Sequence, residues 1–136
     1  MPDRIAGRRL TYLGLAATTI AAGLWVHSVT KTIGADTRDV LGDALWAVMI
    51  VWLISAIAPR AQLLARGAVA LAICVAVEFS QLVHTSSIDA LRSSTIGHLV
   101  LGSGFNPRDL VAYALGVAAA ALVERTIAGF ATTGAA

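Results

Sequence analysis

Charged residues are scarce in this sequence. Asp, Glu, Lys and Arg make up 13% of its 136 residues, whereas a soluble domain usually carries about 25%. Hydrophobic residues make up 57%, so a folded chain would have too little charged surface to stay dissolved in water. This composition argues against a soluble globular protein. We expect one membrane domain that covers residues 1–136.

Cysteine is nearly absent, and the common cofactor motifs do not occur. The one cysteine, Cys74, lies in an apolar run and has no partner for a disulfide or a metal-binding pair. The three histidines share no spacing on one predicted helix. The sequence has no phosphate-binding loop, dinucleotide fingerprint or nucleic-acid motif. It therefore predicts no cofactor, no metal ion and no nucleic-acid partner.

Long apolar runs, in contrast, are abundant. A transmembrane helix needs about 20 largely apolar residues. Four runs meet this length, at about residues 10–29, 37–58, 62–82 and 107–127. The run at 10–29 follows several arginines and is longer than the apolar part of a signal peptide, so we expect an uncleaved anchor helix.

Residues at the ends of these runs predict where the helices begin. Asp36 is placed to cap the run at 37–58, and Asn106 followed by Pro107 is placed to cap the last run. Arg66 lies in the first turn of the run at 62–82. We expect its long side chain to extend along the helix toward the lipid headgroups.

The segment between the third and fourth runs is the least regular part of the chain. Ser86 and Asp89 have the spacing of a capping box, which predicts a short helix at about residues 87–93. The next stretch, TIGHLVLGSGF, is too short to cross a bilayer and too apolar for water. The predicted class is an all-α integral membrane protein with four transmembrane helices and a short apolar re-entrant or interfacial segment before the last helix.

The distribution of basic residues predicts the topology. If the N-terminus is cytoplasmic, the cytoplasmic flanks carry Arg4, Arg8, Arg9, Arg60, Arg66 and Arg125, and the outer flanks carry Lys31, Arg38, Arg92 and Arg108. An excess of Lys and Arg marks cytoplasmic flanks. We therefore expect a multi-pass protein of the cytoplasmic membrane with both termini in the cytoplasm.

Polar residues at matching depth predict a site near the outer face. Glu78 precedes the outer end of the third run, and Asp43 follows the outer start of the second run. At 1.5 Å per residue, each carboxyl group lies about 9–10 Å below the outer surface. Gln81 lies one turn from Glu78 on the same helix face. Arg92 is the nearest cation in the sequence, and Asp109 begins the fourth helix.

A structural role is the alternative for each of these residues. Gln81 could join helices by hydrogen bonds, and Arg92 with Asp109 could form an ion pair near the interface. Asp43 could stabilise the positive end of its helix. A charge at depth in lipid costs several kcal/mol, however, so Glu78 is a poor choice for joining helices. The convergence of these groups on one side favours a functional site.

The same residues carry a resemblance to known families. Glu78-x-x-Gln81, Arg92, Asp109 and Gly116 resemble the signature of VanZ-like membrane proteins. The match is closer to a small bacterial integral-membrane family named only as a domain of unknown function, number twenty-eight-oh-nine. That similarity is carried by residues 42–46, 78–82, 101–105 and 109–113, and it extends from Leu41 to Gly116. VanZ-like proteins commonly have an asparagine where this chain has Tyr113. The resemblance implies a four-helix bacterial membrane protein with a shared polar site.

These observations lead to one favoured function and three alternatives. The favoured function is the binding of an amphiphilic or lipid-linked cell-envelope molecule in an outer-facing pocket, with membrane lipid as the surrounding partner. The predicted pocket residues are Asp43, Glu78, Gln81, Arg92, Asp109 and Tyr113. The alternatives are a membrane enzyme with Glu78 or Asp43 as general base, a small ion- or proton-coupled permease, and a structural subunit. Catalysis ranks lower because the sequence shows no nucleophile or metal set. Transport ranks lower because the inner half of each run has few polar residues.

Overall fold

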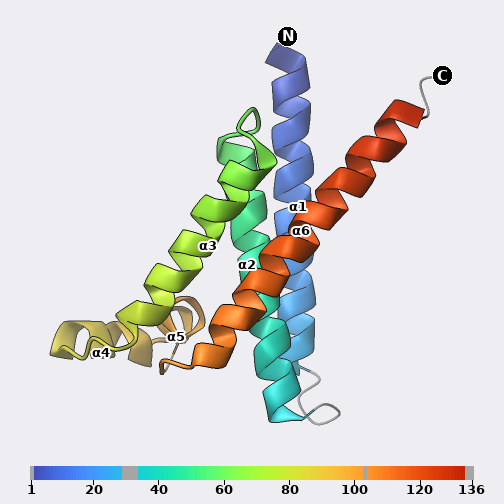
Figure 1. Cartoon of the computed structure of the whole chain (residues 1–136). Helices are drawn as coiled ribbons and strands as arrows, with labels where there is room; N and C mark the ends of the chain where they lie inside the picture. Colours follow the sequence, from blue (N-terminus) through green and yellow to red (C-terminus); the bar gives the residue numbers. More distant parts are fainter. Residues whose placement is uncertain (1, 29–33, 103, 134–136) are drawn as a thin grey trace.

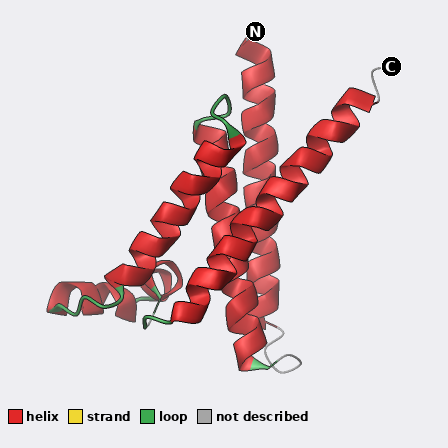
Figure 2. Ribbon diagram, viewed as in Figure 1, coloured by secondary structure: helices red, strands yellow, loops and turns green. Residues whose placement is uncertain are grey.

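The described part of the chain is entirely helical where it has regular structure. The computed structural model describes residues 2–28, 34–102 and 104–133. These residues form the helices α1 (Pro2–Ser28), α2 (Ala35–Ile57), α3 (Leu63–Ser80), α4 (Ser86–Ser93), α5 (Thr95–Leu101) and α6 (Pro107–Thr133). No strand occurs among them (Figure 2). The predicted all-α class is confirmed.

Four of these helices, α1, α2, α3 and α6, are long and apolar enough to cross a membrane. The apolar stretch before the last span forms α5, which has seven residues and is about 10 Å long. It is therefore too short to cross the hydrocarbon core of about 30 Å. The chain is a multi-pass membrane protein with the predicted four spans and a short apolar segment before the last one.

Both termini lie at one end of the bundle, and α4 and α5 lie at the other end (Figure 1). The two short helices follow the carboxyl end of α3 and precede the amino end of α6. α2 packs against α1, α3 and α6. α4 contacts α5, and α5 contacts α3, so the two short helices stay at the carboxyl end of α3.

The helix starts agree with the predicted caps at one of three positions. Asn106 precedes Pro107, and its Oδ1 accepts a hydrogen bond of 3.2 Å from the backbone N–H of Arg108, as predicted. The prediction for Asp36 was wrong, because α2 begins at Ala35 and Asp36 lies in its first turn. The capping residue of α4 is Thr85, whose hydroxyl accepts from the N–H of Ile88, so the predicted cap at Ser86 was one residue late.

The middle of the bundle is a tightly packed apolar core. Trp52 of α2 is almost fully buried, and its ring stacks on Tyr12 of α1 at a centroid distance of 6.2 Å. Gly116 of α6 lies against α2, where any added Cβ would collide with the carbonyl oxygen of Ala44 and press on Ala47. Only glycine permits this close approach of α2 and α6. The short distance between the two helices brings together the acids near their amino ends, Asp43 and Asp109.

Candidate polar pocket

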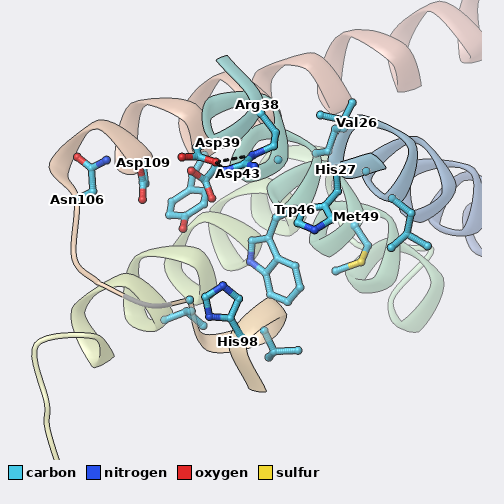
Figure 3. A pocket seen from close by; sticks show the side chains of 18 of the residues that line it. Val26, His27, Arg38, Asp39, Asp43, Trp46, Met49, His98, Asn106 and Asp109 are labelled. Atoms are coloured by element: carbon cyan, nitrogen blue, oxygen red, sulfur yellow. Dashed lines mark hydrogen bonds and ion pairs between the residues drawn. The ribbon is translucent and has the colours of Figure 1, made fainter. Parts of the chain in front are cut away.

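A pocket of about 590 Å³ opens beside α2 at the end of the bundle where α5 and the start of α6 lie. Its lining comes from α1, α2, the end of α3, α5, the adjoining loop and the start of α6. The acids of α2 and α6 gather at one end of the pocket, and Trp46, Met49 and His98 of α5 line the part away from them (Figure 3). The pocket therefore has a polar end and an apolar wall.

Glu78 is fully buried and joins α3 to the start of α6. One carboxylate oxygen accepts a hydrogen bond of 3.0 Å from the hydroxyl of Tyr113. The other accepts a hydrogen bond of 2.6 Å from the backbone N–H of Asn106. Glu78 thus faces the bundle interior, as predicted from the cost of a carboxylate in lipid. Both of its oxygens are used to position α6.

Asp43 of α2 and Asp109 of α6 meet at the polar end of the pocket (Figure 3). Their carboxyl groups are close enough to share a hydrogen bond, and both lie within the electrostatic reach of Glu78. Asp39 lies one turn nearer the start of α2 and forms an ion pair of 2.8 Å with Arg38. The sequence had placed Asp43 and Asp109 in one pocket, and the structure brings them into direct contact.

Gln81 follows the last residue of α3 and lines the same pocket. Its side chain is 6% exposed, and its Oε1 is buried without a hydrogen-bond partner. The amide packs on Gly102, which has a positive φ of 65° and no room for a Cβ. The side chain is therefore held in place, while its carbonyl oxygen keeps an unused acceptor site.

Arg92 has a different role from the one we expected. Its guanidinium donates hydrogen bonds to the backbone carbonyl oxygens of Ser80 at 2.6 Å and Val83 at 2.9 Å. Its nearest carboxylate is Asp89, at 3.4 Å, and not Asp109. Arg92 was predicted to be a pocket residue, but it is absent from the lining, because this side chain binds the carbonyl oxygens of Ser80, the last residue of α3, and of Val83 in the turn that follows.

Residues 35–117 match the family model described as Protein of unknown function (DUF2809). The chain belongs to this family. The matched segment contains all six residues predicted for the site, from Asp43 to Tyr113, and leaves out α1 and the second half of α6. No solved structure matches the chain.

A second polar cluster, which the sequence did not predict, lies at the opposite end of the spans. Arg66 forms an ion pair of 2.6 Å with Glu124 and donates a hydrogen bond of 2.6 Å to Ser55. The hydroxyl of Tyr12 donates to the same oxygen of Glu124 at 2.8 Å, and the guanidinium carbon of Arg66 lies 5.4 Å from the centre of the Tyr12 ring. Tyr12 and Glu124 lie outside the segment matched by the family model.

This second cluster corrects two expectations. Arg66 is 3% exposed and therefore does not extend toward the headgroups. The half of the spans nearer the termini, which we expected to have few polar residues, contains four that bond one another. The signal in the sequence that could have predicted this cluster was Glu124, an acid within the apolar run of α6. Because Arg125 follows it directly, the two residues resembled the charged flank of an ordinary transmembrane helix.

An apolar layer separates the two polar clusters. On α2, Val51 and Trp52 lie between Asp43 and Ser55 and are almost fully buried. On α3 and α6, the buried residues that pack in the same core cluster are Ala70 and Ala120. The described residues therefore form no continuous polar path from one cluster to the other.

Proposed function

We propose that this protein binds an amphiphilic or lipid-linked cell-envelope molecule, whose polar end occupies the pocket of α2, α5 and α6. The observation that carries the proposal is the combination of a polar end and an apolar wall in one pocket among membrane-spanning helices. Binding pockets for small molecules are largely apolar, with a few polar groups that set the orientation. An amphiphile meets both conditions.

The side from which the molecule enters follows from the predicted topology. α5 and the amino end of α6, which line the pocket, lie at the end of the bundle away from both termini (Figure 1). With the termini in the cytoplasm of a bacterial cell, the pocket faces outward. An envelope molecule in the outer leaflet would then reach it directly.

The arrangement supports the alternative functions less well. Glu78 is a poor general base, because both of its oxygens already accept hydrogen bonds from the protein. Asp43 is the remaining candidate from the sequence, and the hydroxyl of Tyr113 in the same pocket lining is already used to donate to Glu78. The apolar layer of Val51 and Trp52 disfavours a proton path across the bundle. These observations favour binding over catalysis and transport.

A glycine in the pocket lining provides the test. Gly42 lines the pocket, and a Cβ added there would meet nothing within 4 Å, so we expect the side chain of Gly42→Leu to occupy part of the pocket. Gly14→Leu is the matched control, because Gly14 is equally open and lies outside the pocket lining. Neither change should lower stability, since leucine favours helix more than glycine does.

The measurement is native mass spectrometry of the gently extracted protein, followed by identification of the lipids and metabolites that it retains. The wild-type protein and the Gly14→Leu variant are expected to retain the same molecule, and the Gly42→Leu variant is expected to lose it. Equal retention by all three proteins would contradict the proposal.

A further inference from the structure

A separate groove lies between α1 and α6, next to the second polar cluster. Both helices pack against α2, but among the described residues their backbones do not approach each other closely. They diverge toward their free ends (Figure 1), and a cavity of about 370 Å³ lies beside them. We call this cavity the α1–α6 groove. It is lined by Arg8, Thr11, Tyr12 and Leu15 of α1, by Trp52 of α2, and by Glu124 and Ile127 of α6.

The groove leads from the lipid-facing surface toward the core. Ile127 is 45% exposed, whereas Tyr12 and Trp52 are 6% and 2% exposed. Because α1 and α6 are both long and apolar enough to span a membrane, the space outside this part of the bundle is filled by lipid. Apolar cavities in proteins stay dry and take up apolar molecules. The deep end of the groove therefore suits an acyl chain.

Arg8 supplies the free charge of the groove. It is exposed, and it forms no ion pair with any acid whose side chain the structure describes. Glu124, the acid of the lining, is already paired with Arg66 at 2.6 Å. The hydroxyl of Thr11 already donates to a backbone carbonyl oxygen of α1. The guanidinium of Arg8 thus remains as the hydrogen-bond donor for a ligand.

The position of Arg8 along α1 sets the orientation of that ligand. Arg8 comes two residues before the apolar run that begins at Leu10, so its guanidinium lies at the level of the lipid headgroups. Leu15 follows seven residues later, which places it about 10 Å deeper. The groove therefore has its cation at headgroup level and its apolar lining toward the membrane interior. A phospholipid has the same order of phosphate and acyl chain.

The surroundings of the groove favour an anionic phospholipid. Six of the ten basic residues of the sequence lie at this end of the bundle, against two of the eight acids, Asp3 and Glu124. A headgroup with an ammonium would add positive charge beside Arg8. We infer that the α1–α6 groove binds one anionic phospholipid, with its phosphate on Arg8 and an acyl chain against Leu15 and Trp52. This site lies at the end of the bundle away from the pocket and does not depend on the proposed function.

Nanodiscs with equal amounts of phosphatidylglycerol and phosphatidylcholine provide the first test. The wild-type protein is released from them in a native mass spectrometer, and the lipids that it retains are identified by mass. One phosphatidylglycerol should be retained about fivefold or more over phosphatidylcholine, because one unit of charge near a membrane surface has about that effect on binding. Equal retention of the two lipids would contradict the inference.

Two adjacent arginines give a variant and its matched control. Arg8→Gln should lower the retention of phosphatidylglycerol about tenfold, because a hydrogen bond between two charged groups is lost. Arg9→Gln removes the same charge from the next residue, which is also exposed but does not line the groove, so it should retain the lipid. Thermal unfolding checks that both variants fold. An equal loss in both would show a general attraction to the basic surface and no site.

The fluorescence of Trp52 locates the acyl chain with the groove lining unchanged. The sequence has three tryptophans, and Trp25 and Trp46 lie outside the groove lining, so both are replaced by phenylalanine. Phosphatidylglycerol with brominated acyl chains, mixed with ordinary phosphatidylcholine, should quench Trp52 more than the reverse mixture does. If the two mixtures quench Trp52 equally, no anionic lipid occupies the groove.

The Gly42→Leu variant separates this site from the pocket. It should retain phosphatidylglycerol as the wild-type protein does, because Gly42 does not line the groove. If Gly42→Leu and Arg8→Gln lose the same lipid, the groove is not a separate site and the inference is overturned. If the molecule lost by Gly42→Leu is the one molecule that the wild type retains, the proposed function stands without the groove. A lipid-free dimer in the native spectrum would assign the groove to a second copy of the chain and also refute the inference.

Discussion

Replacement of Glu78 by methionine should strongly destabilise the bundle, whereas replacement by glutamine should not. Methionine fills a similar volume but accepts no strong hydrogen bond. It would leave the N–H of Asn106 and the hydroxyl of Tyr113 without their partner. A buried donor without a partner costs about 1–3 kcal/mol, so Glu78→Met should cost about 2–6 kcal/mol of unfolding free energy.

Glutamine can keep both hydrogen bonds. Its carbonyl oxygen can accept from the N–H of Asn106, and its amide can donate to the hydroxyl of Tyr113, because a hydroxyl group both donates and accepts. Only the extra strength of bonds to a charged group is lost, at about 1 kcal/mol per bond. The expected cost of Glu78→Gln is therefore below about 2 kcal/mol. Tyr113→Phe removes one of the two bonds and should cost less than Glu78→Met.

Reversible unfolding in mixed micelles, with circular dichroism as the signal, measures these free energies. The argument depends on the order of the variants, with Glu78→Met the least stable and Glu78→Gln close to wild type. If Glu78→Gln is as unstable as Glu78→Met, the charge and not the hydrogen bonds holds α3 to α6. If Glu78→Met is as stable as wild type, the link through Asn106 and Tyr113 does not contribute to stability.

Two other predictions concern the cluster of Arg66 and Glu124 and the short helices. Arg66→Met and Glu124→Leu should each cost about 3–5 kcal/mol in the same unfolding assay, because each change leaves the charge of the other side chain without its partner. The double variant should be more stable than either single variant. Additive losses of unfolding free energy would show that the two side chains do not interact. A topology reporter fused after Gly104 should lie on the same side of the membrane as one fused after Ser86, because α5 is too short to cross. Opposite readings would mean that the chain has a fifth span.

Much of the candidate site could be predicted from the sequence because lipid penalises charge strongly. Asp43 and Glu78 lie too deep in their spans to face hydrocarbon, so both had to face protein or the pocket. Gln81 follows Glu78 by one helical turn, which placed it on the same side. What each group bonds was not predictable. The donors to Glu78 are the N–H of Asn106, 28 positions away in the chain, and the hydroxyl of Tyr113 in α6, 35 positions away.

The two arginines show where prediction from the sequence failed. Arg66 and Arg92 lie near the ends of predicted helices, where a basic residue usually extends toward the headgroups or pairs with a nearby acid. The structure instead buries both, with Arg66 on Glu124, 58 positions away, and Arg92 on the carbonyl groups of Ser80 and Val83. Local patterns do not contain these contacts, since they depend on how α3 lies against α6 and α4.

The sequence by itself determined the number of spans, the helical class and the burial of Glu78 inside the bundle. These properties follow from apolar run length and from the cost of placing charge or a free backbone group in lipid, which act on each segment separately. The pairing of Asp43 with Asp109 was decided only by the tertiary structure. That pairing requires Gly116, which lets α2 and α6 approach closely, and such an approach is a property of two helices together.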